Sequence, residues 1–81
     1  MTIEQFGRRV KDIRRKKKLR REDVGAYTFA YSVTKDYYRT MGRLERGELR
    51  LLTPDEIIRL CEALKIDYNE LLGELQWNKN N

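Results

Sequence analysis

The 81-residue chain contains no histidine, one cysteine and one proline, and each scarcity excludes a class of structure. Cys61 alone cannot form an intramolecular disulfide, and without histidine a zinc site would lack its usual ligands. One proline and five glycines are too few for a linker-rich or collagen-like chain. No apolar run approaches the roughly 18 residues of a membrane span. Acidic Glu4 and Asp12 do not fit a signal peptide. We therefore expect no metal, no cofactor, no membrane contact and a cytoplasmic location.

Charge is distributed unevenly along the chain. Residues 1–50 carry fifteen lysines and arginines against seven acidic residues, a net charge of +8, whereas residues 51–81 have a net charge of −3. A basic half of this kind indicates a polyanionic partner. With 40% hydrophobic residues the chain can fold, but its length supports only one modest core. We do not expect an enzyme, because histidine, a glycine-rich phosphate loop and a clustered carboxylate pair are all missing from the sequence.

Two helices are predicted in the basic half before residue 30. Thr2, followed three residues later by Gln5, has the form of a capping box, which satisfies the first free backbone N–H groups of a helix. Apolar residues then recur at helical spacing, so this helix should extend to about Lys17. They are Ile3, Phe6, Val10 and Ile13. Acidic residues in a first turn favour a second helix over Arg21–Phe29.

A third helix is predicted over Lys35–Arg46. The residues Ser32–Thr34 interrupt the helical pattern, and the hydroxyl of Thr34 is a suitable N-cap. Gly47 should end the helix in the left-handed conformation. In this register Met41 and Leu44 face the core.

The acidic half predicts two more helices. Thr53, Pro54 and Glu56 are the cap, first position and capping-box partner of a fourth helix. Its buried face should consist of Ile57, Leu60, Cys61 and Leu64, with Cys61 a small core residue rather than a reactive thiol. A similar capping pattern at 67–70 begins a short fifth helix, which extends through Leu71 and Leu72 toward Leu75. The domain therefore spans residues 1–75, and 76–81 form a polar tail in which Trp77 either packs on the fold or contacts a partner.

Four segments of the chain resemble, in order and near the usual spacing, the lambda-repressor-like (Cro/CI or XRE) helix-turn-helix family. They are Phe6–Arg14, Leu19–Val24, Met41–Gly47 and Asp55–Leu72. The resemblance covers about residues 3–73. It implies an all-α, five-helix DNA-binding domain whose third helix lies in the major groove of double-stranded DNA. Such domains usually bind a palindromic operator as a symmetric homodimer.

The chain departs from this family in two places. Arg20 and Arg21 stand where the family usually has Ser/Thr and Gln at the start of the second helix, and a cation there can still reach the same phosphate. The stretch Ala26–Asp36 is about half a dozen residues longer than the usual turn. We interpret its aromatic residues as core or turn packing rather than as base-stacking groups. They are Tyr27, Phe29 and Tyr31.

Counting back from Glu45 and Gly47 gives the positions that match the family's base-facing ones. They are Tyr38, Arg39, Gly42 and Arg43. The planar guanidinium groups of the two arginines match the acceptor pair of guanine. Tyr38 could contact a thymine methyl or a phosphate. Gly42 either permits close backbone approach to DNA or relieves crowding.

Other charged residues are assigned to supporting contacts. Phosphate contacts are expected from Arg21, Lys35 and Arg46, with plain solvation as the alternative for each. The resemblance also implies a partly buried ion pair between Arg14 and Glu45 that fixes the third helix.

The function expected from these features is that of a sequence-specific transcriptional regulator, a repressor that dimerises and occludes promoter DNA. The alternative is an antitoxin-like protein-interaction module, whose insertion and Trp77 would hold a protein partner. A homodimer should form through the fifth helix, Leu75 and Trp77, which leaves the basic helices available for DNA.

Overall fold

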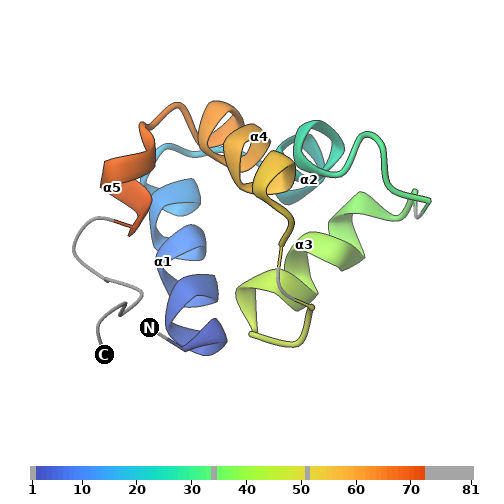
Figure 1. Ribbon diagram of the computed structural model, residues 1–81, viewed down its shortest axis with the longest axis horizontal. Coiled ribbons are helices and arrows are strands. Elements are labelled where there is room, and N and C mark those ends of the chain that lie inside the picture. The colour runs from blue at the N-terminus through green and yellow to red at the C-terminus, as the bar shows by residue number, and fades with distance from the viewer. Residues whose placement is uncertain (1, 34, 51, 73–81) are drawn as a thin grey trace.

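The computed structural model describes residues 2–33, 35–50 and 52–72 (Figure 1). Within these residues the chain forms five helices and no strand, so the predicted all-α class is confirmed. The helices are α1 (Ile3–Lys16), α2 (Arg21–Thr28), α3 (Tyr37–Glu45), α4 (Pro54–Leu64) and α5 (Tyr68–Leu72). No described helix is long and apolar enough to cross a membrane. The predictions for Thr34, Leu75, Trp77 and the tail 76–81 fall outside the described residues.

Both predicted capping boxes are present. At α1, the Thr2 hydroxyl accepts from the Gln5 N–H at 3.0 Å and Gln5 Oε1 accepts from the Thr2 N–H at 2.8 Å. At α4, Thr53 and Glu56 make the same reciprocal bonds at 3.2 and 2.9 Å, and Pro54 occupies the first turn. These bonds satisfy backbone donors that have no partner inside the helix, which fixes where each helix begins.

The predicted start of the third helix is wrong. The prediction began this helix at Lys35, whereas α3 begins at Tyr37 and Asp36 is its N-cap. The Asp36 carboxylate accepts from the Arg39 N–H at 3.1 Å. Aspartate is a strong N-cap, so this side chain sets the boundary and leaves Lys35 outside the helix. The other end agrees with the prediction, because Gly47 follows with a positive φ of 75°.

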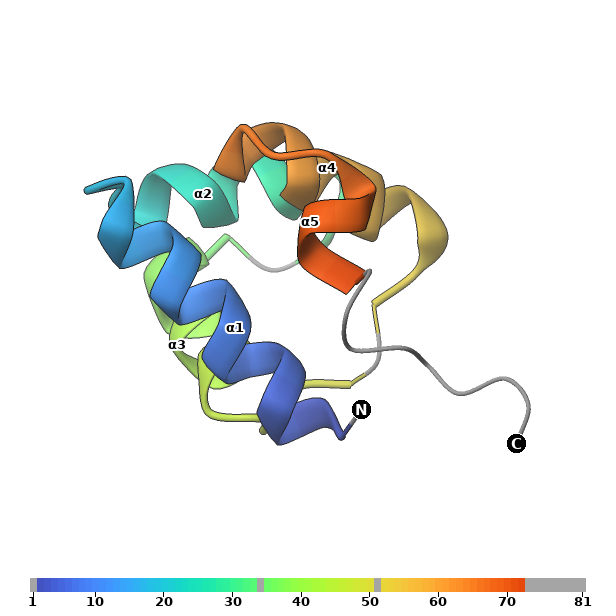
Figure 2. The ribbon, with the colours of Figure 1, turned by 90° about the vertical axis from the view of Figure 1, so that its left-hand side faces the viewer.

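The core lies between all five helices. Helix α2 packs against both α3 and α4, α1 packs against α3, and α4 packs against α5. In Figure 2, α1 lies between α3 and α5. The predicted core residues Met41, Leu44, Leu60 and Leu64 are fully buried, and Ile57 is half-buried against the same cluster.

Two glycines allow the helices of the basic half to approach closely. A Cβ atom on Gly25 would lie 2.7 Å from the Tyr37 carbonyl oxygen and 2.8 Å from Met41 Cγ, where α2 meets α3. A Cβ on Gly7 would lie 2.8 Å from the Glu45 carbonyl oxygen, where α1 meets α3. All three distances are shorter than van der Waals contact, so any larger residue would push α3 away.

Cys61 is a core residue, as predicted. Its side chain is buried and belongs to the hydrophobic core cluster. This burial raises the pKa of the thiol above its ordinary value, because a thiolate would lose its hydration. The cysteine is therefore held in its protonated, weakly nucleophilic form.

Candidate nucleic-acid interface

Helix α3 has one face in the core and one face in solvent. Met41 and Leu44 are fully buried, whereas Tyr38 is 57% exposed and Arg39 and Arg43 are exposed. Because these three exposed residues lie at helical spacing, they share the outer face. The register counted from Gly47 therefore places three of the four predicted base-facing residues in solvent.

Gly42 differs from the other three residues because it is buried. A Cβ atom at this position would meet only Nη1 of Arg46, at 3.2 Å, besides the helix's own backbone. Relief of crowding by core side chains is therefore not the reason for a glycine here. The atom nearest to this position belongs to the end of a flexible arginine side chain, which can rotate away.

Glu45 braces α3 from the core side. Its carboxylate, buried with a side chain 2% exposed, accepts from Arg14 Nε at 2.6 Å and from Arg14 Nη2 at 3.2 Å. The predicted ion pair is thus present and bidentate, which is the strongest geometry for this pair. Arg14 also donates from Nη1 to the Leu19 carbonyl at 2.9 Å, so most of its donors are committed inside the protein.

Arg21 belongs to the same network, a role that was not predicted for it. Its Nε lies 3.1 Å from Glu45 Oε1, and its Nη1 donates to Tyr38 Oη at 3.0 Å. The bond to Glu45 raises the pKa of the Arg21 guanidinium. Arg21 therefore links α2 to Glu45 and Tyr38 on α3, and the phosphate contact stays a prediction. No local pattern signals this link, because Arg21 and Glu45 are 24 positions apart.

The bond from Arg21 decides how the Tyr38 hydroxyl is used. A guanidinium can only donate, so Tyr38 Oη is the acceptor and its own proton is directed elsewhere. The Arg21 guanidinium also lies 5.2 Å from the centre of the Tyr38 ring. The ring is consequently held beside the Arg21 guanidinium, and the hydroxyl proton is free to be donated to another acceptor.

The remaining cations around α3 are exposed. Lys35 precedes the helix, and Arg46 follows it with Nε 3.2 Å from Glu48 Oε1, in a pair whose side chains are both more than half exposed. Arg43 Nη2 donates to the Glu48 carbonyl at 3.2 Å. Exposed pairs of this type contribute little to stability, so these cations can exchange such partners for a phosphate or a base.

The aromatic residues of the insertion lie against α4, away from this face. Phe29 is buried in the core, in agreement with the packing interpretation. Tyr27 donates from its hydroxyl to Glu62 at 2.8 Å, which raises the pKa of Tyr27. The Arg59 guanidinium lies 4.6 Å from the Tyr27 ring and 4.9 Å from the Tyr31 ring. Two of the three aromatics therefore form a surface cluster with α4.

Comparison with protein-family models, with curated proteins and with solved structures yields no match. Any function of the chain has therefore to be inferred from its own residues. Their arrangement combines an exposed face with Tyr38, Arg39 and Arg43, two flanking cations, and a buried carboxylate that fixes the helix from behind.

Proposed function

We propose that this chain is a sequence-specific double-stranded DNA-binding protein that regulates transcription as a repressor. In this proposal it is of the lambda-repressor-like helix-turn-helix type, and α3 enters the major groove. The observation that carries the proposal is the two-sided character of α3. Its outer face holds Tyr38, Arg39 and Arg43, while its inner face is locked to α1 and α2 through Glu45. A fixed helix with cations on its free side suits base recognition, which requires defined side-chain positions.

Each outer residue has a distinct role in this proposal. Arg39 and Arg43 donate to the O6 and N7 acceptors of guanine, in the fork geometry that arginine provides. Tyr38 acts as a hydrogen-bond donor, because its acceptor side is occupied by Arg21. Its partner is therefore an acceptor such as guanine N7, thymine O4 or a phosphate oxygen, and the adenine and cytosine amino groups are disfavoured.

The electrostatics of the chain support the same proposal. The net charge of +8 lies in residues 1–50, which contain α1, α2 and α3. Lys35 and Arg46 flank α3 and are assigned to phosphates, whereas Arg21 is assigned to positioning Tyr38 and Glu45. Because each neutralised phosphate changes the log–log salt slope by about −0.9, binding should weaken steeply with salt.

A homodimer on a palindromic operator completes the proposal. The dimer surface is expected to include α5, which leaves α3 available for DNA. Two copies would place two α3 helices about one helical turn apart on one side of the duplex, a spacing of roughly 34–36 Å.

The experiment is a selection of bound fragments from random DNA, followed by titration of variants against the recovered operator and its single-base mutants. Arg43→Ala should cost about 1–3 kcal/mol on the operator and remove the preference at one base pair per half-site. The matched control Arg46→Ala should weaken all sequences similarly and reduce the salt slope by about one unit. Tyr38→Phe keeps the aromatic ring but removes the hydroxyl donor, so any preference for a base that offers an acceptor to Tyr38 should be lost.

Two results would reject the proposal. Failure to enrich any sequence, with binding that does not change with salt, would show that the basic half does not bind duplex DNA. Equal losses on every sequence for Arg43→Ala, together with altered base preference for Arg46→Ala, would show that the register of α3 is wrong.

One observation favours a second candidate function, an antitoxin-like module that holds a protein partner. Near the insertion, Tyr31 is 87% exposed, Val33 is 98% exposed and Ile58 on α4 is 53% exposed. Large exposed apolar side chains are common at interaction surfaces. The two functions are distinguished by whether purified protein alone retards operator DNA, or does so only with the product of a neighbouring gene.

A further inference from the structure

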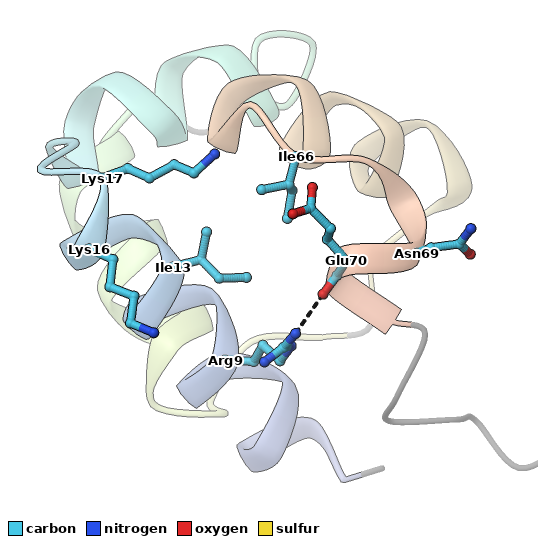
Figure 3. Close-up of a pocket in the computed structure, with 7 residues that line it drawn as sticks. All are labelled: Arg9, Ile13, Lys16, Lys17, Ile66, Asn69 and Glu70. Atoms are coloured by element: carbon cyan, nitrogen blue, oxygen red, sulfur yellow. Dashed lines mark hydrogen bonds between the residues drawn. The ribbon is translucent and has the colours of Figure 1, made fainter.

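A cleft of about 330 Å³ opens between α1 and α5 (Figure 3). None of the residues that line the cleft lies on α3, and α5 lies on the other side of α1 from α3 (Figure 2), so the cleft is separate from the proposed DNA surface. Arg9, Ile13 and Lys16 line it from α1. These residues are four and three positions apart, which places them on one face of the helix.

The cleft combines cations with an apolar surface. Ile13 of α1 and Ile66, which precedes α5, are half-buried against the core, and both line the cleft. Three cations also line it, from Arg9, Lys16 and Lys17, against the single carboxylate of Glu70. That carboxylate accepts from the Asp67 N–H at 3.0 Å, and Lys17 donates to the Lys65 carbonyl at 2.7 Å. Both bonds involve uncharged backbone groups, so the cleft keeps a net positive charge from three cations and one carboxylate.

Arg9 has a buried donor without an acceptor. Its Nη2 donates to the Glu70 carbonyl at 2.7 Å, the bond drawn in Figure 3. Its Nε is buried and is one of two buried side-chain polar atoms without a hydrogen-bond partner in the part of the chain that the structure describes. A buried donor without an acceptor is costly, so the guanidinium of Arg9 is only partly satisfied within the protein.

We propose that this cleft binds a small organic monocarboxylate with an apolar body. The carboxylate pairs with the guanidinium of Arg9 and with the ammonium of Lys16, both of which line the cleft. The apolar body covers Ile13 and Ile66, which removes their exposed surface from water. Cations beside an apolar floor select this class of ligand over neutral molecules, which leave the donors unpaired, and over inorganic anions, which leave the isoleucines exposed. The inference does not depend on DNA binding.

The test is a ¹H–¹⁵N NMR titration of the whole chain at constant ionic strength, with phenylacetate as the probe and phenylacetamide as its neutral counterpart. Phenylacetate should shift the amides of Ile13, Ile66 and Asn69 saturably, with a dissociation constant on the order of 1 mM, as expected for a ligand of this size. Phenylacetamide should bind about tenfold more weakly or not at all.

Matched variants locate the site. Arg9→Gln and Lys16→Gln should each weaken phenylacetate binding about tenfold, whereas Arg8→Gln and Arg15→Gln, which change the same charge on exposed residues outside the cleft, should not. Arg9→Gln also removes the bond from Arg9 to α5 and could therefore disturb the fold. Lys16→Gln tests the same cleft without removing that bond. The proposal is overturned if the three amides do not shift, if phenylacetamide binds as well as phenylacetate, or if the control variants lose as much affinity as the cleft variants.

Discussion

Residues 2–50 and residues 52–72 are stabilised by different kinds of interaction. In the first region, α1, α2 and α3 converge on one buried carboxylate, Glu45, whose arginine partners lie 31 and 24 positions away along the chain. In the second region, α4 begins at a local capping box and packs on α5 through apolar side chains. Both regions have a capping box and buried apolar side chains, but only the first adds a charge network between residues far apart in the sequence.

This difference indicates which region defines the candidate site. A buried ion pair is weak evidence for stability, because desolvation of the charges offsets much of their attraction. The network nevertheless constrains the geometry strongly, because both arginines must point at the same carboxylate. The network therefore fixes the direction of α3, and the apolar region supplies the surface against which α2 packs. Substitutions in the two regions should therefore lower the free energy of unfolding by different amounts and for different physical reasons.

The largest effect is expected from the centre of the network. Glu45→Ala leaves the guanidinium of Arg14 buried without a carboxylate, so the free energy of unfolding should fall by about 3–5 kcal/mol. Chemical denaturation measures this loss. The control Glu48→Ala removes a partner of exposed Arg46 and should cost less than about 1 kcal/mol. Equal losses for the two variants would show that the network does not hold the first region together.

Two glycine substitutions should change the stability of the fold in opposite directions. Gly25→Ala places a methyl group against the Tyr37 carbonyl and Met41 and should destabilise the fold by about 1–3 kcal/mol. Gly42→Ala meets only a flexible arginine end, so the gain in helix propensity should leave stability unchanged or raise it by up to about 1 kcal/mol. Thermal denaturation compares them. If Gly25→Ala melts at the same temperature as the native chain, the close approach of α2 and α3 is wrong.

The second region should respond to loss of its cap. Thr53→Ala removes the acceptor for the Glu56 N–H at the start of α4 and should cost about 1 kcal/mol, with Thr53→Ser as the conservative control. The expected change is a lower denaturation midpoint without altered base preference on DNA. If Thr53→Ala lowered the free energy of unfolding more than Glu45→Ala does, the cap of α4 would matter more for stability than the charge network.

The smallest effect is expected on the pH dependence of stability that arises from the ion pair of Arg50 and Glu56. Arg50 lowers the pKa of the Glu56 carboxylate below its ordinary value, by a hydrogen bond in a pair with atoms 2.7 Å apart. Because the folded-state pKa is the lower one, the stabilisation is present above the unfolded-state value of about 4.3 and is lost as the pH falls through the folded-state value. Glu56→Gln should therefore cost less than about 1 kcal/mol at pH 7 and nothing at low pH.

The matched background for this measurement is Arg50→Gln. In that background the difference in stability between glutamate and glutamine at position 56 should become smaller, because the main cause of the lowered pKa is gone while the hydrogen bonds with Thr53 remain. Glutamine at position 56 can still accept from the Thr53 N–H, so Glu56→Gln removes the charge but keeps the capping bond. A difference that persists at low pH would mean that the ion pair is not its source.

Local signals explain what could be predicted from the sequence. The capping boxes at Thr2 and Thr53 and the end at Gly47 depend on residues within a few positions, and all three are present in the structure. The Asp36 cap was not predicted, because Thr34 offers a competing hydroxyl two residues earlier. The left-handed conformations of Lys18 and Lys65 have no sequence signal either, since lysine carries no preference for that conformation.

The candidate site was predictable only in part, for a physical reason. The spacing on α3 places Tyr38, Arg39 and Arg43 in solvent, because helical periodicity is a local property. The contacts of Arg21 with Glu45 and Tyr38 depend on how α2 crosses α3, which no short stretch of sequence specifies. The same limitation applies to the cleft between α1 and α5, whose lining residues come from both ends of the chain.

The sharing of one carboxylate by two arginines also has a consequence for how the protein opens. A helix whose contacts are separate can detach by itself, but neither α1 nor α2 can leave Glu45 without uncovering a buried charge that the other helix still contacts. The amide hydrogens of α1, α2 and α3 should therefore exchange with solvent as one cooperative unit, with a common free energy of opening. Helix α5, with only five residues, should open at lower energy and exchange earlier. The surface proposed to bind DNA would then belong to the slowest-exchanging part of the molecule.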